Sequence, residues 1–321
     1  MQILLTTTSF ADTPGRHHDV LAESHFDVVT VRGPINENDL IQLIGQHGGF
    51  DAFLCGDDHI TARVMDAARP RLRVISKYGI GLDSIDVAAA TARKLPVLFT
   101  PGVNETTVAE HTIMLMIAVA KNLWVHASAV KAGQWKRQTG KELFGKRLGL
   151  VGSGRIAREV AKRAVAMGMT IASFGHYWPP EIVHDFNIQL YPSVDALLPV
   201  CDVVSLHTNL TPETQGMINR DRIGLMRDGA ILVNTGRGGL IVEQDVADAC
   251  KSGKLFGYGA DTLAHEPIKT PHIFQLVDNI LLTPHVGSRT FESVERQGLR
   301  AARNTVNFLT GNADYIQANK F

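Results

Sequence analysis

Cysteine is scarce in this sequence, and no two cysteines lie near each other along the chain. Cys55, Cys201 and Cys250 are the only three among 321 residues. Their wide spacing argues against a disulfide framework and against a structural zinc site. The cysteine usage instead fits a protein of the reducing cytoplasm, and we expect no metal centre.

Long apolar runs and an excess of charge of one sign are also missing. The longest apolar stretch, Ile113–Ala120, is too short to cross a bilayer, which takes roughly 20 residues. The first residues have no basic segment and too short an apolar run for a signal peptide. The 32 basic residues balance 32 acidic residues, and no segment concentrates lysine and arginine. We therefore expect a cytoplasmic protein that binds neither a membrane nor nucleic acid.

The pattern that is present is a repeated alternation of short apolar strands with helices. At this length two domains are expected. The alternation runs from Gln2 to Phe99 and again from Leu148 to Thr283, which implies two parallel sheets. A last helix, Thr290–Leu309, follows the second sheet, and we infer that it packs back on the first domain. The prediction is an α/β protein with two doubly wound domains, one of residues 1–100 and 287–321, the other of residues 101–286.

A glycine-rich turn follows the first strand of the second alternation. Within Leu148–Ala157 an apolar run breaks into Gly152-x-Gly154-x-x-Ala157 and continues with helical spacing. Gly152 allows the tight strand-to-helix turn, Gly154 lets the backbone approach a pyrophosphate, and Ala157 keeps the helix close to the sheet. Anions bind at the N-terminus of such a helix. Glycine turns also occur for packing alone, so the motifs downstream must decide.

Three polar motifs follow three successive strands of the second alternation, and they carry Arg237, Glu266 and His285. Ligands of an open parallel sheet bind outside the carboxyl ends of its strands. Singly, each residue has an ordinary structural interpretation. Together they suit hydride chemistry on a 2-oxo acid, because a guanidinium grips the carboxylate, an imidazole protonates the carbonyl oxygen and a carboxylate keeps that imidazole charged. The carboxylate is expected to raise the histidine pKa.

These motifs resemble those of the D-isomer-specific 2-hydroxyacid dehydrogenases, the family of D-glycerate, D-lactate and phosphoglycerate dehydrogenases. The resemblance covers nearly the whole chain. Besides the glycine turn, it rests on Lys77–Asp86, Pro101–Asn104, Val108–His111, His207–Pro212, Asn234–Gly238, Glu266–Pro267 and Thr283–Gly287. It implies an oxidoreductase with a Rossmann NAD(P)-binding domain and a flavodoxin-like substrate domain. The implied substrate is a small D-2-hydroxy acid or 2-oxo acid of the hydroxypyruvate, glyoxylate or 3-phosphoglycerate class.

The resemblance also implies roles for single residues. Arg237, Glu266 and His285 form the catalytic trio, and Asp261 contacts the nicotinamide carboxamide. The expected substrate-binding residues are Lys77 and the backbone amides of Gly79 and Ile80. The expected cofactor contacts are Gly152, Gly154, Arg155, Ile156, Gly175, His207, Pro212, Thr235, Asp261, Gly287 and Val108.

The segment from Thr106 to Leu123 is predicted to be one helix that is apolar almost all round, so we expect it to be buried between domains or subunits. In the family, the helix around Val108–His111 usually builds a two-fold dimer interface. A homodimer is therefore expected.

The cofactor and the substrate stay open. A NAD-specific fingerprint places an acid at the end of its second strand, but this chain has Phe174-Gly175-His176 there. No basic residue follows to bind a 2′-phosphate, so NAD is slightly favoured while NADP stays open. The acids Asp57 and Asp58 near the expected substrate site disfavour a phosphorylated substrate. The lack of a regulatory segment after Phe321 also favours a small 2-oxo acid over phosphoglycerate.

Two rival functions also remain. One is a dinucleotide-sensing, corepressor-like interaction protein on the same fold, although the chain lacks disordered peptide-binding extensions. The other is a nicotinamide enzyme acting on a phosphonate or on formate. Formate dehydrogenases resemble this layout with glutamine beside the histidine, and Glu266 argues against that branch.

Overall fold

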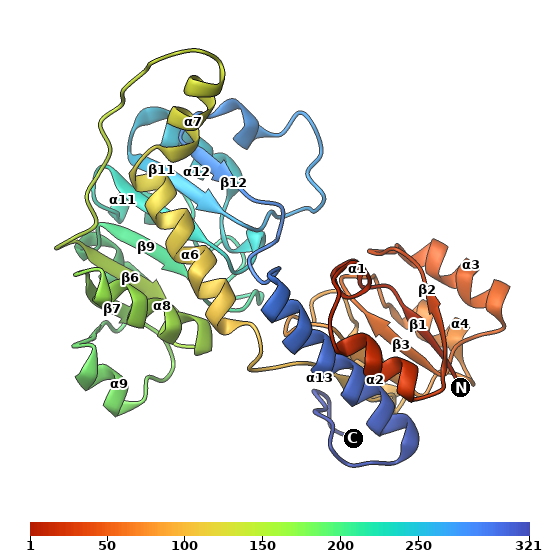
Figure 1. Cartoon of the computed structure of the whole chain (residues 1–321). Helices are drawn as coiled ribbons and strands as arrows, with labels where there is room; N and C mark the ends of the chain where they lie inside the picture. Colours follow the sequence, from red (N-terminus) through yellow and green to blue (C-terminus); the bar gives the residue numbers. More distant parts are fainter. The chain divides into compact units, whose positions relative to one another are not determined.

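The computed structural model describes all 321 residues and divides into two compact units. Unit 1 comprises Met1–Asn104 and Arg289–Phe321, and unit 2 comprises Glu105–Ser288. The sequence-based boundaries, after residues 100 and 286, lie slightly earlier in both cases. Unit 2 is thus a single insertion into the chain of unit 1 (Figure 1).

Unit 1 is built on a five-stranded parallel sheet in the order β2-β1-β3-β4-β5. Its strands are β1 (Gln2–Leu5), β2 (Asp27–Thr30), β3 (Ala52–Cys55), β4 (Val74–Lys77) and β5 (Val97–Leu98). One face is covered by α1 (Thr8–Asp12), α2 (His17–Glu23) and α13 (Phe291–Thr310), and the other by α3 (Glu37–His47), α4 (Ala62–Ala68) and α5 (Val87–Ala92). This order is that of flavodoxin-like sheets.

Both faces of the unit 1 sheet are buried, which explains why its strands are apolar throughout. In β1, Ile3 and Leu5 pack beneath α13, whereas Leu4 belongs to the core on the opposite face. The long helix α13 begins where the Thr290 side chain accepts a hydrogen bond from the Ser293 amide, and it ends at a left-handed glycine. The last helix therefore packs on the sheet formed by the first hundred residues.

Unit 2 is built on a seven-stranded parallel sheet in the order β12-β11-β10-β9-β6-β7-β8. Its strands are β6 (Arg147–Val151), β7 (Thr170–Phe174), β8 (Gln189–Leu190), β9 (Val203–Leu206), β10 (Ala230–Asn234), β11 (Leu255–Ala260) and β12 (Ile280–Leu282). Helices α6 (Glu105–Ala120), α8 (Arg155–Ala166) and α9 (Pro180–Asp185) cover one face, and α10 (Val194–Leu197), α11 (Arg220–Leu225) and α12 (Glu243–Ser252) the other. The predicted pair of doubly wound parallel sheets is confirmed.

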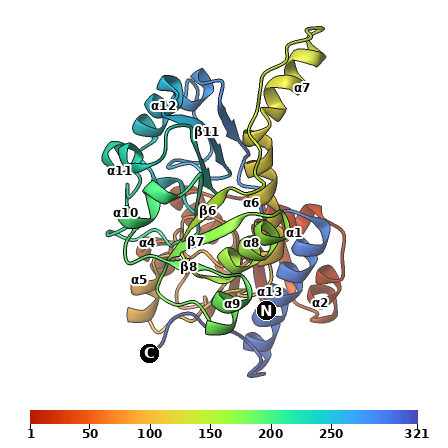
Figure 2. The ribbon, with the colours of Figure 1, turned by 90° about the vertical axis from the view of Figure 1, so that its left-hand side faces the viewer.

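The predicted helix from Thr106 to Leu123 is wrong in its extent. Helix α6 ends at Ala120, Asn122 adopts a left-handed backbone with φ +51°, and α7 (Leu123–Lys131) continues in a new direction. Figure 2 shows α7 extending away from the sheet of unit 2. No single helix is both long and apolar enough to cross a membrane, and only α6 and α7 together, across a 67° bend, reach that length and composition.

The burial expected for this helix also needs correction. Helix α6 packs on α8, β10 and β11, so most of its apolar side chains are buried in the core of unit 2 itself. Met114 and Ile117 remain exposed. The all-round apolar character of α6 therefore arises mainly from packing within one unit.

Candidate active site

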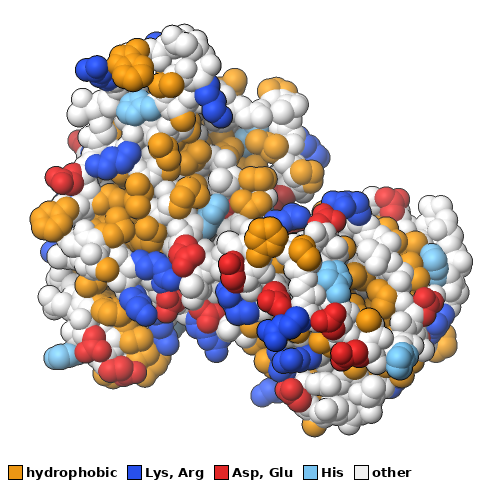
Figure 3. All heavy atoms as spheres, viewed as in Figure 1, with side chains coloured by type: hydrophobic (Ala, Val, Ile, Leu, Met, Phe, Trp, Pro, Cys, Tyr) orange, Lys and Arg blue, Asp and Glu red, His pale blue; other side chains and the backbone are white.

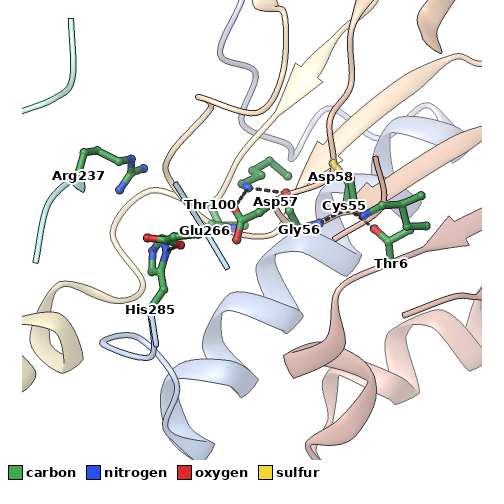
Figure 4. Close-up of polar contacts among 12 residues, drawn as sticks. Thr6, Cys55, Gly56, Asp57, Asp58, Thr100, Arg237, Glu266 and His285 are labelled. Carbon is green, nitrogen blue, oxygen red and sulfur yellow. Dashed lines mark hydrogen bonds and ion pairs between the residues drawn. The ribbon is translucent and has the colours of Figure 1, made fainter. Parts of the chain in front are cut away.

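The three residues of the predicted trio lie after three adjacent strands of unit 2. Arg237 follows β10, Glu266 follows β11 and His285 follows β12. The His285 Nδ1 atom lies 2.8 Å from Glu266 Oε2, and the two side chains are about 41% and 35% exposed. The other carboxylate oxygen of Glu266 accepts a hydrogen bond from the Leu263 amide at 2.8 Å. One oxygen therefore fixes the carboxylate to its own loop while the other faces the imidazole (Figure 4).

The Arg237 loop is held from inside by Asn234. This fully buried side chain accepts a hydrogen bond from the Gly236 amide at 3.0 Å and donates one to the Arg237 carbonyl at 2.9 Å. The next residue, Gly238, lies so close to the Glu266 loop that a Cβ atom there would be 1.9 Å from the Leu263 carbonyl carbon. Glycine thus lets the two loops pack directly together, and in Figure 4 the Arg237 side chain extends towards the Glu266–His285 pair.

Asp261 stands at the end of β11 and is 3% exposed. Its carboxylate accepts hydrogen bonds from Thr283 Oγ1 at 2.6 Å, from the Val286 amide at 2.9 Å and from the Gly287 amide at 2.7 Å. Burial raises the pKa of Asp261, but hydrogen bonds from His111 and Thr283 outweigh it and bring this pKa below its usual value. Asp261 is thus an ionised side chain that binds the loop after β12.

The glycine turn after β6 has the geometry that a dinucleotide pyrophosphate requires. Gly152 has φ +118°, and a Cβ atom there would lie 2.3 Å from the His207 carbonyl oxygen. Gly154 is the N-cap of the 12-residue helix α8, with no side-chain cap and with no atom within 4 Å of where its Cβ would lie. The first amides of α8, from Arg155 and Ile156, therefore begin a helix whose N-terminus is open to an anion.

Gly175, at the expected position of the ribose-binding acid, has a packing role. A Cβ atom there would lie 2.7 Å from both Cβ and Oγ of Ser153 in the glycine turn. A carboxylate side chain at this position would require the turn to move. Ser153, which lies between the two glycines of the turn, therefore leaves no room for an acidic side chain at the end of β7.

The remaining predicted cofactor residues lie on neighbouring elements of unit 2. His207 Nε2 lies 2.9 Å from Ser205 Oγ, and burial lowers the pKa of His207 to about 4. Thr235 Oγ1 lies 2.8 Å from Thr112 Oγ1 on α6, where Val108 is also buried. Pro212, in contrast, is exposed in the loop after β9.

The predicted substrate residues lie at the carboxyl end of the unit 1 sheet and already have partners there. Lys77 is 4% exposed; its Nζ atom is 2.7 Å from Asp57 Oδ1 and also donates to the Gly56 carbonyl. The Gly79 amide donates to Thr100 Oγ1 at 3.0 Å. Of the three predicted groups, the amide of Ile80 is the remaining candidate for a substrate carboxylate.

Asp58 has a structural role that the sequence did not indicate, because its buried side chain binds neighbouring loops. Its side chain is 1% exposed and accepts hydrogen bonds from the amides of Ile35 and Gly56 and from the Thr6 hydroxyl. It therefore ties together the loops after β1 and β3. Of the two acids expected near the substrate, only Asp57 is exposed, at 73% for its side chain.

Two residues that lie close to the trio were quoted in motifs but given no role. His111 Nε2 lies 2.8 Å from Thr283 Oγ1, and Thr283 donates to Asp261. The available signal was a histidine next to the long apolar run of α6, which indicates a buried polar partner. The partner itself lies 172 residues away in the sequence, so no local pattern could identify it.

Comparisons with known proteins identify the family of the chain. Residues 113–287 match the family model of the D-isomer specific 2-hydroxyacid dehydrogenase, NAD binding domain. The chain is 40% identical over 244 residues to a hydroxypyruvate reductase of Thermotoga maritima, a match that covers 75% of this chain and 78% of that protein. It is 39% identical over 254 residues to a D-3-phosphoglycerate dehydrogenase of Methanocaldococcus jannaschii, covering 78% of this chain but only 48% of that protein.

The fold was also compared with solved structures. The TT0316 protein of Thermus thermophilus superposes with a TM-score of 0.89 at 36% identity, covering 99% of this chain and all of that one. The family model and the overall fold thus agree on an NAD-binding domain of this family within unit 2. The chain belongs to the D-isomer specific 2-hydroxyacid dehydrogenase family.

Proposed function

We propose that this protein interconverts a small D-2-hydroxy acid and its 2-oxo acid with a nicotinamide cofactor. The observation that carries the proposal is the 2.8 Å contact between His285 Nδ1 and Glu266 Oε2 beside the NAD-binding sheet. A carboxylate in contact with one ring nitrogen favours the charged imidazole and fixes the ring orientation. The other ring nitrogen, Nε2, is then the one that exchanges a proton with the substrate.

The chemistry divides between the cofactor and three side chains. Bound NADH supplies the hydride that reaches C2 of the 2-oxo acid. Arg237 binds the substrate carboxylate and orients C2, because a guanidinium matches a carboxylate in two parallel hydrogen bonds. His285 gives the carbonyl oxygen its proton from Nε2 and ends neutral. In the reverse direction the neutral ring takes the hydroxyl proton, and Glu266 stabilises the imidazolium that forms.

The substrate proposed is an unphosphorylated 2-oxo acid such as hydroxypyruvate or glyoxylate. The exposed carboxylate of Asp57 lies against Lys77 at the end of the unit 1 sheet, so the lysine charge is already balanced. The predicted substrate residues of unit 1 therefore offer no unbalanced lysine charge to a phosphate group. One relative named above is a hydroxypyruvate reductase, which is consistent with this choice.

The cofactor proposed is NAD, with NADP as the alternative. Gly175 leaves no carboxylate to repel a 2′-phosphate, but the sequence after it offers no lysine or arginine to bind one.

We further propose a homodimer built on exposed apolar side chains of α6, α7 and the segment after them. Figure 3 shows hydrophobic side chains gathered over this part of unit 2. The three cysteines are unpaired and buried, which fits a reducing compartment such as the cytoplasm.

The corepressor-like alternative gains no support from the two curated relatives, because a hydroxypyruvate reductase and a D-3-phosphoglycerate dehydrogenase are both enzymes by name. The test of the proposed function is a panel of 2-oxo acids, including glyoxylate, hydroxypyruvate and 3-phosphohydroxypyruvate, each with NADH and with NADPH. We expect NADH oxidation with at least one unphosphorylated acid. Turnover with the phosphorylated acid alone would refute the substrate proposal while leaving the reaction class in place.

A further inference from the structure

His285 has a backbone conformation that side-chain-bearing residues seldom adopt. Its φ is +53°, in the left-handed region. The residue lies in the loop that follows β12, and its amide donates to the Asp261 carbonyl at 2.9 Å and to the Thr283 carbonyl at 3.0 Å. A non-glycine residue stays in this region only when surrounding contacts hold it there. Contacts around the His285 loop must therefore stabilise this conformation.

A single carboxylate binds the loop on both sides of His285. Asp261 accepts from the Thr283 hydroxyl before it and from the amides of Val286 and Gly287 after it, at 2.6, 2.9 and 2.7 Å. A Cβ atom on Gly287 would lie 2.8 Å from Asp261 Oδ2, so glycine is needed for this approach. The side chain and the carbonyl of Asp261 together fix the backbone before, at and after His285.

His111 extends this network from α6. Its Nε2 atom lies 2.8 Å from Thr283 Oγ1 and 3.3 Å from Asp261 Oδ1, and its side chain is 14% exposed. An ionised carboxylate only accepts hydrogen bonds, so the Thr283 hydroxyl proton points to Asp261. The hydroxyl oxygen must then accept from His111, which places a proton on His111 Nε2. The hydrogen bonds run in one direction, from His111 through Thr283 to Asp261.

We propose that His111 and Thr283, acting through Asp261, are positioning residues that hold His285 in its left-handed conformation with the imidazole facing Glu266. The effect on catalysis rests on the proposed function, whereas the effect on the His285 loop does not. Oδ1 of Asp261 has three donors around it, while Oδ2 has the Gly287 amide. A carboxylate oxygen can accept more than one hydrogen bond, so Oδ2 can bind the Gly287 amide and also accept from a cofactor amide.

The network is tested with variants that remove one side-chain partner at a time. His111→Phe removes the donor on α6, Thr283→Val removes the hydroxyl, and Thr283→Ser keeps it. His126→Phe is the matched control, because the His126 ring also makes a hydrogen bond in unit 2, which it accepts from the Gln138 amide, but it lies outside the network. A small displacement of a reacting group costs about 10²-fold in rate. We expect kcat for 2-oxo acid reduction to fall about 10- to 100-fold in His111→Phe and Thr283→Val, with recovery in Thr283→Ser.

A second readout does not need turnover. In protein labelled with nitrogen-15 histidine, proton–nitrogen spectra should show His111 with its proton on Nε2. The ring signals of His285 should move in His111→Phe and Thr283→Val, return in Thr283→Ser and stay in place in His126→Phe. Equilibrium NADH binding, followed by fluorescence, should stay within about twofold of the wild type, because a positioning role affects the chemical step.

The experiments distinguish a failure of the proposed network from a failure of the proposed reaction. Wild-type kcat and unmoved His285 signals in both His111→Phe and Thr283→Val would overturn the network. Parallel loss of NADH binding and kcat without recovery in Thr283→Ser would indicate a general structural role, which also overturns it. If the wild type reduces no 2-oxo acid, the reaction proposal fails, and the His285 signals still decide whether the network holds the loop.

Discussion

Glu266 carries a charge that lies 2.8 Å from the imidazole of His285. Replacing Glu266 with Gln keeps the shape and a hydrogen-bonding group but removes the negative charge that favours the imidazolium. Carbonyl reduction needs that imidazolium. In the variant, we therefore expect the rate of reduction to start falling at a lower pH than in the wild type. At neutral pH the rate should fall by about 10²-fold or more, a typical loss when general acid catalysis is impaired. The measurement is the pH profile of kcat/KM for reduction.

Unit 2 offers a matched control for this substitution. Glu243 also contacts a histidine, with 3.3 Å between Glu243 Oε2 and His272 Nε2, and binds the Ala264 amide. Glu243→Gln removes the same charge beside a different imidazole and should leave the pH profile unchanged. A Glu266→Gln enzyme with the wild-type profile would show that the carboxylate does not support His285 in catalysis.

Because of the buried His207, we expect the stability of the folded protein to depend on pH. Burial lowers the pKa of His207 to about 4, while an unfolded histidine titrates near pH 6.5. Between these values the unfolded chain binds a proton that the folded chain does not, so this stability is fully present above pH 6.5 and is lost as the pH falls towards 4. At about pH 5 the loss amounts to about 2 kcal/mol relative to neutral pH.

His207→Gln retains a polar group near Ser205 Oγ but does not titrate. Its apparent unfolding temperature should therefore fall less than that of the wild type between about pH 7 and pH 5. Thermal unfolding followed by circular dichroism measures the difference. Equal falls in the two proteins would mean that His207 takes up its proton in the folded state.

Among the structural elements, the loops after β10 and β11 are coupled by their close packing. A Cβ atom on Gly238 would lie 1.9 Å from the carbonyl carbon of Leu263 and 2.2 Å from the Ala264 amide nitrogen. Gly238→Ala must push the Arg237 loop away from the Glu266 loop. We expect a stability loss of about 1 to 3 kcal/mol, typical of overpacking, and a fall in kcat of more than about tenfold because the side chains of the trio separate.

Gly224→Ala is the matched control for this prediction. Gly224 lies in α11, and a Cβ atom there would have no atom within 4 Å. Alanine in a helix is more stable than glycine by about 0.5 to 1 kcal/mol, so this variant should fold at least as well as the wild type with unchanged kcat. A Gly238→Ala enzyme that keeps wild-type kcat would show that the two loops are not coupled in this way.

The buried strands could be predicted from the sequence. The sequence predicts strands at Thr170–Phe174, Val203–Leu206 and Ala230–Asn234, and β7, β9 and β10 have these bounds. Buried parallel strands are continuous apolar runs, which makes them recognisable. The order of these runs also predicted that Arg237, Glu266 and His285 follow neighbouring strands. Four elements were missed: α1, α7, α9 and the two-residue edge strand β8. Both residues of β8 are exposed and show no period.

The contacts that complete the candidate site could not be predicted locally. The partners of His111 and Lys77 lie far away in the sequence, and each depends on how strands meet at the edge of a sheet. The break after α6 depends on a left-handed Asn122, a conformation that many asparagines do not adopt. The apolar runs of the sequence therefore predicted where the strands end. The hydrogen-bond partners at those ends could be identified only from the tertiary structure.

For the molecule as a whole, the exposed apolar side chains of unit 2 predict a homodimer. Among them are Leu123 (56% exposed), Val130 (54%), Trp135 (76%) and Phe144 (72%), in α7 and the segment after it. Large exposed apolar patches mark interaction sites. Light scattering coupled to size exclusion should show a dimer for the wild type and a monomer for the double variant Leu123→Ser and Trp135→Ser.

Leu276→Ser is the control for the dimer, because Leu276 is 67% exposed but lies in another part of unit 2. This variant should remain dimeric. A monomeric wild type at micromolar concentration, or a double variant that still dimerises, would exclude α7 and the segment after it as the interface.

The central claim is that His285 passes the proton in a nicotinamide-dependent reduction of a 2-oxo acid. The most direct test measures NADH oxidation by the wild type and by His285→Gln with hydroxypyruvate and glyoxylate, together with NADH binding at equilibrium. The account predicts turnover by the wild type and a loss of about 10²- to 10⁴-fold in the variant, with NADH binding unchanged. A wild type that binds NADH but reduces neither acid, or a variant that keeps the wild-type rate, would contradict it.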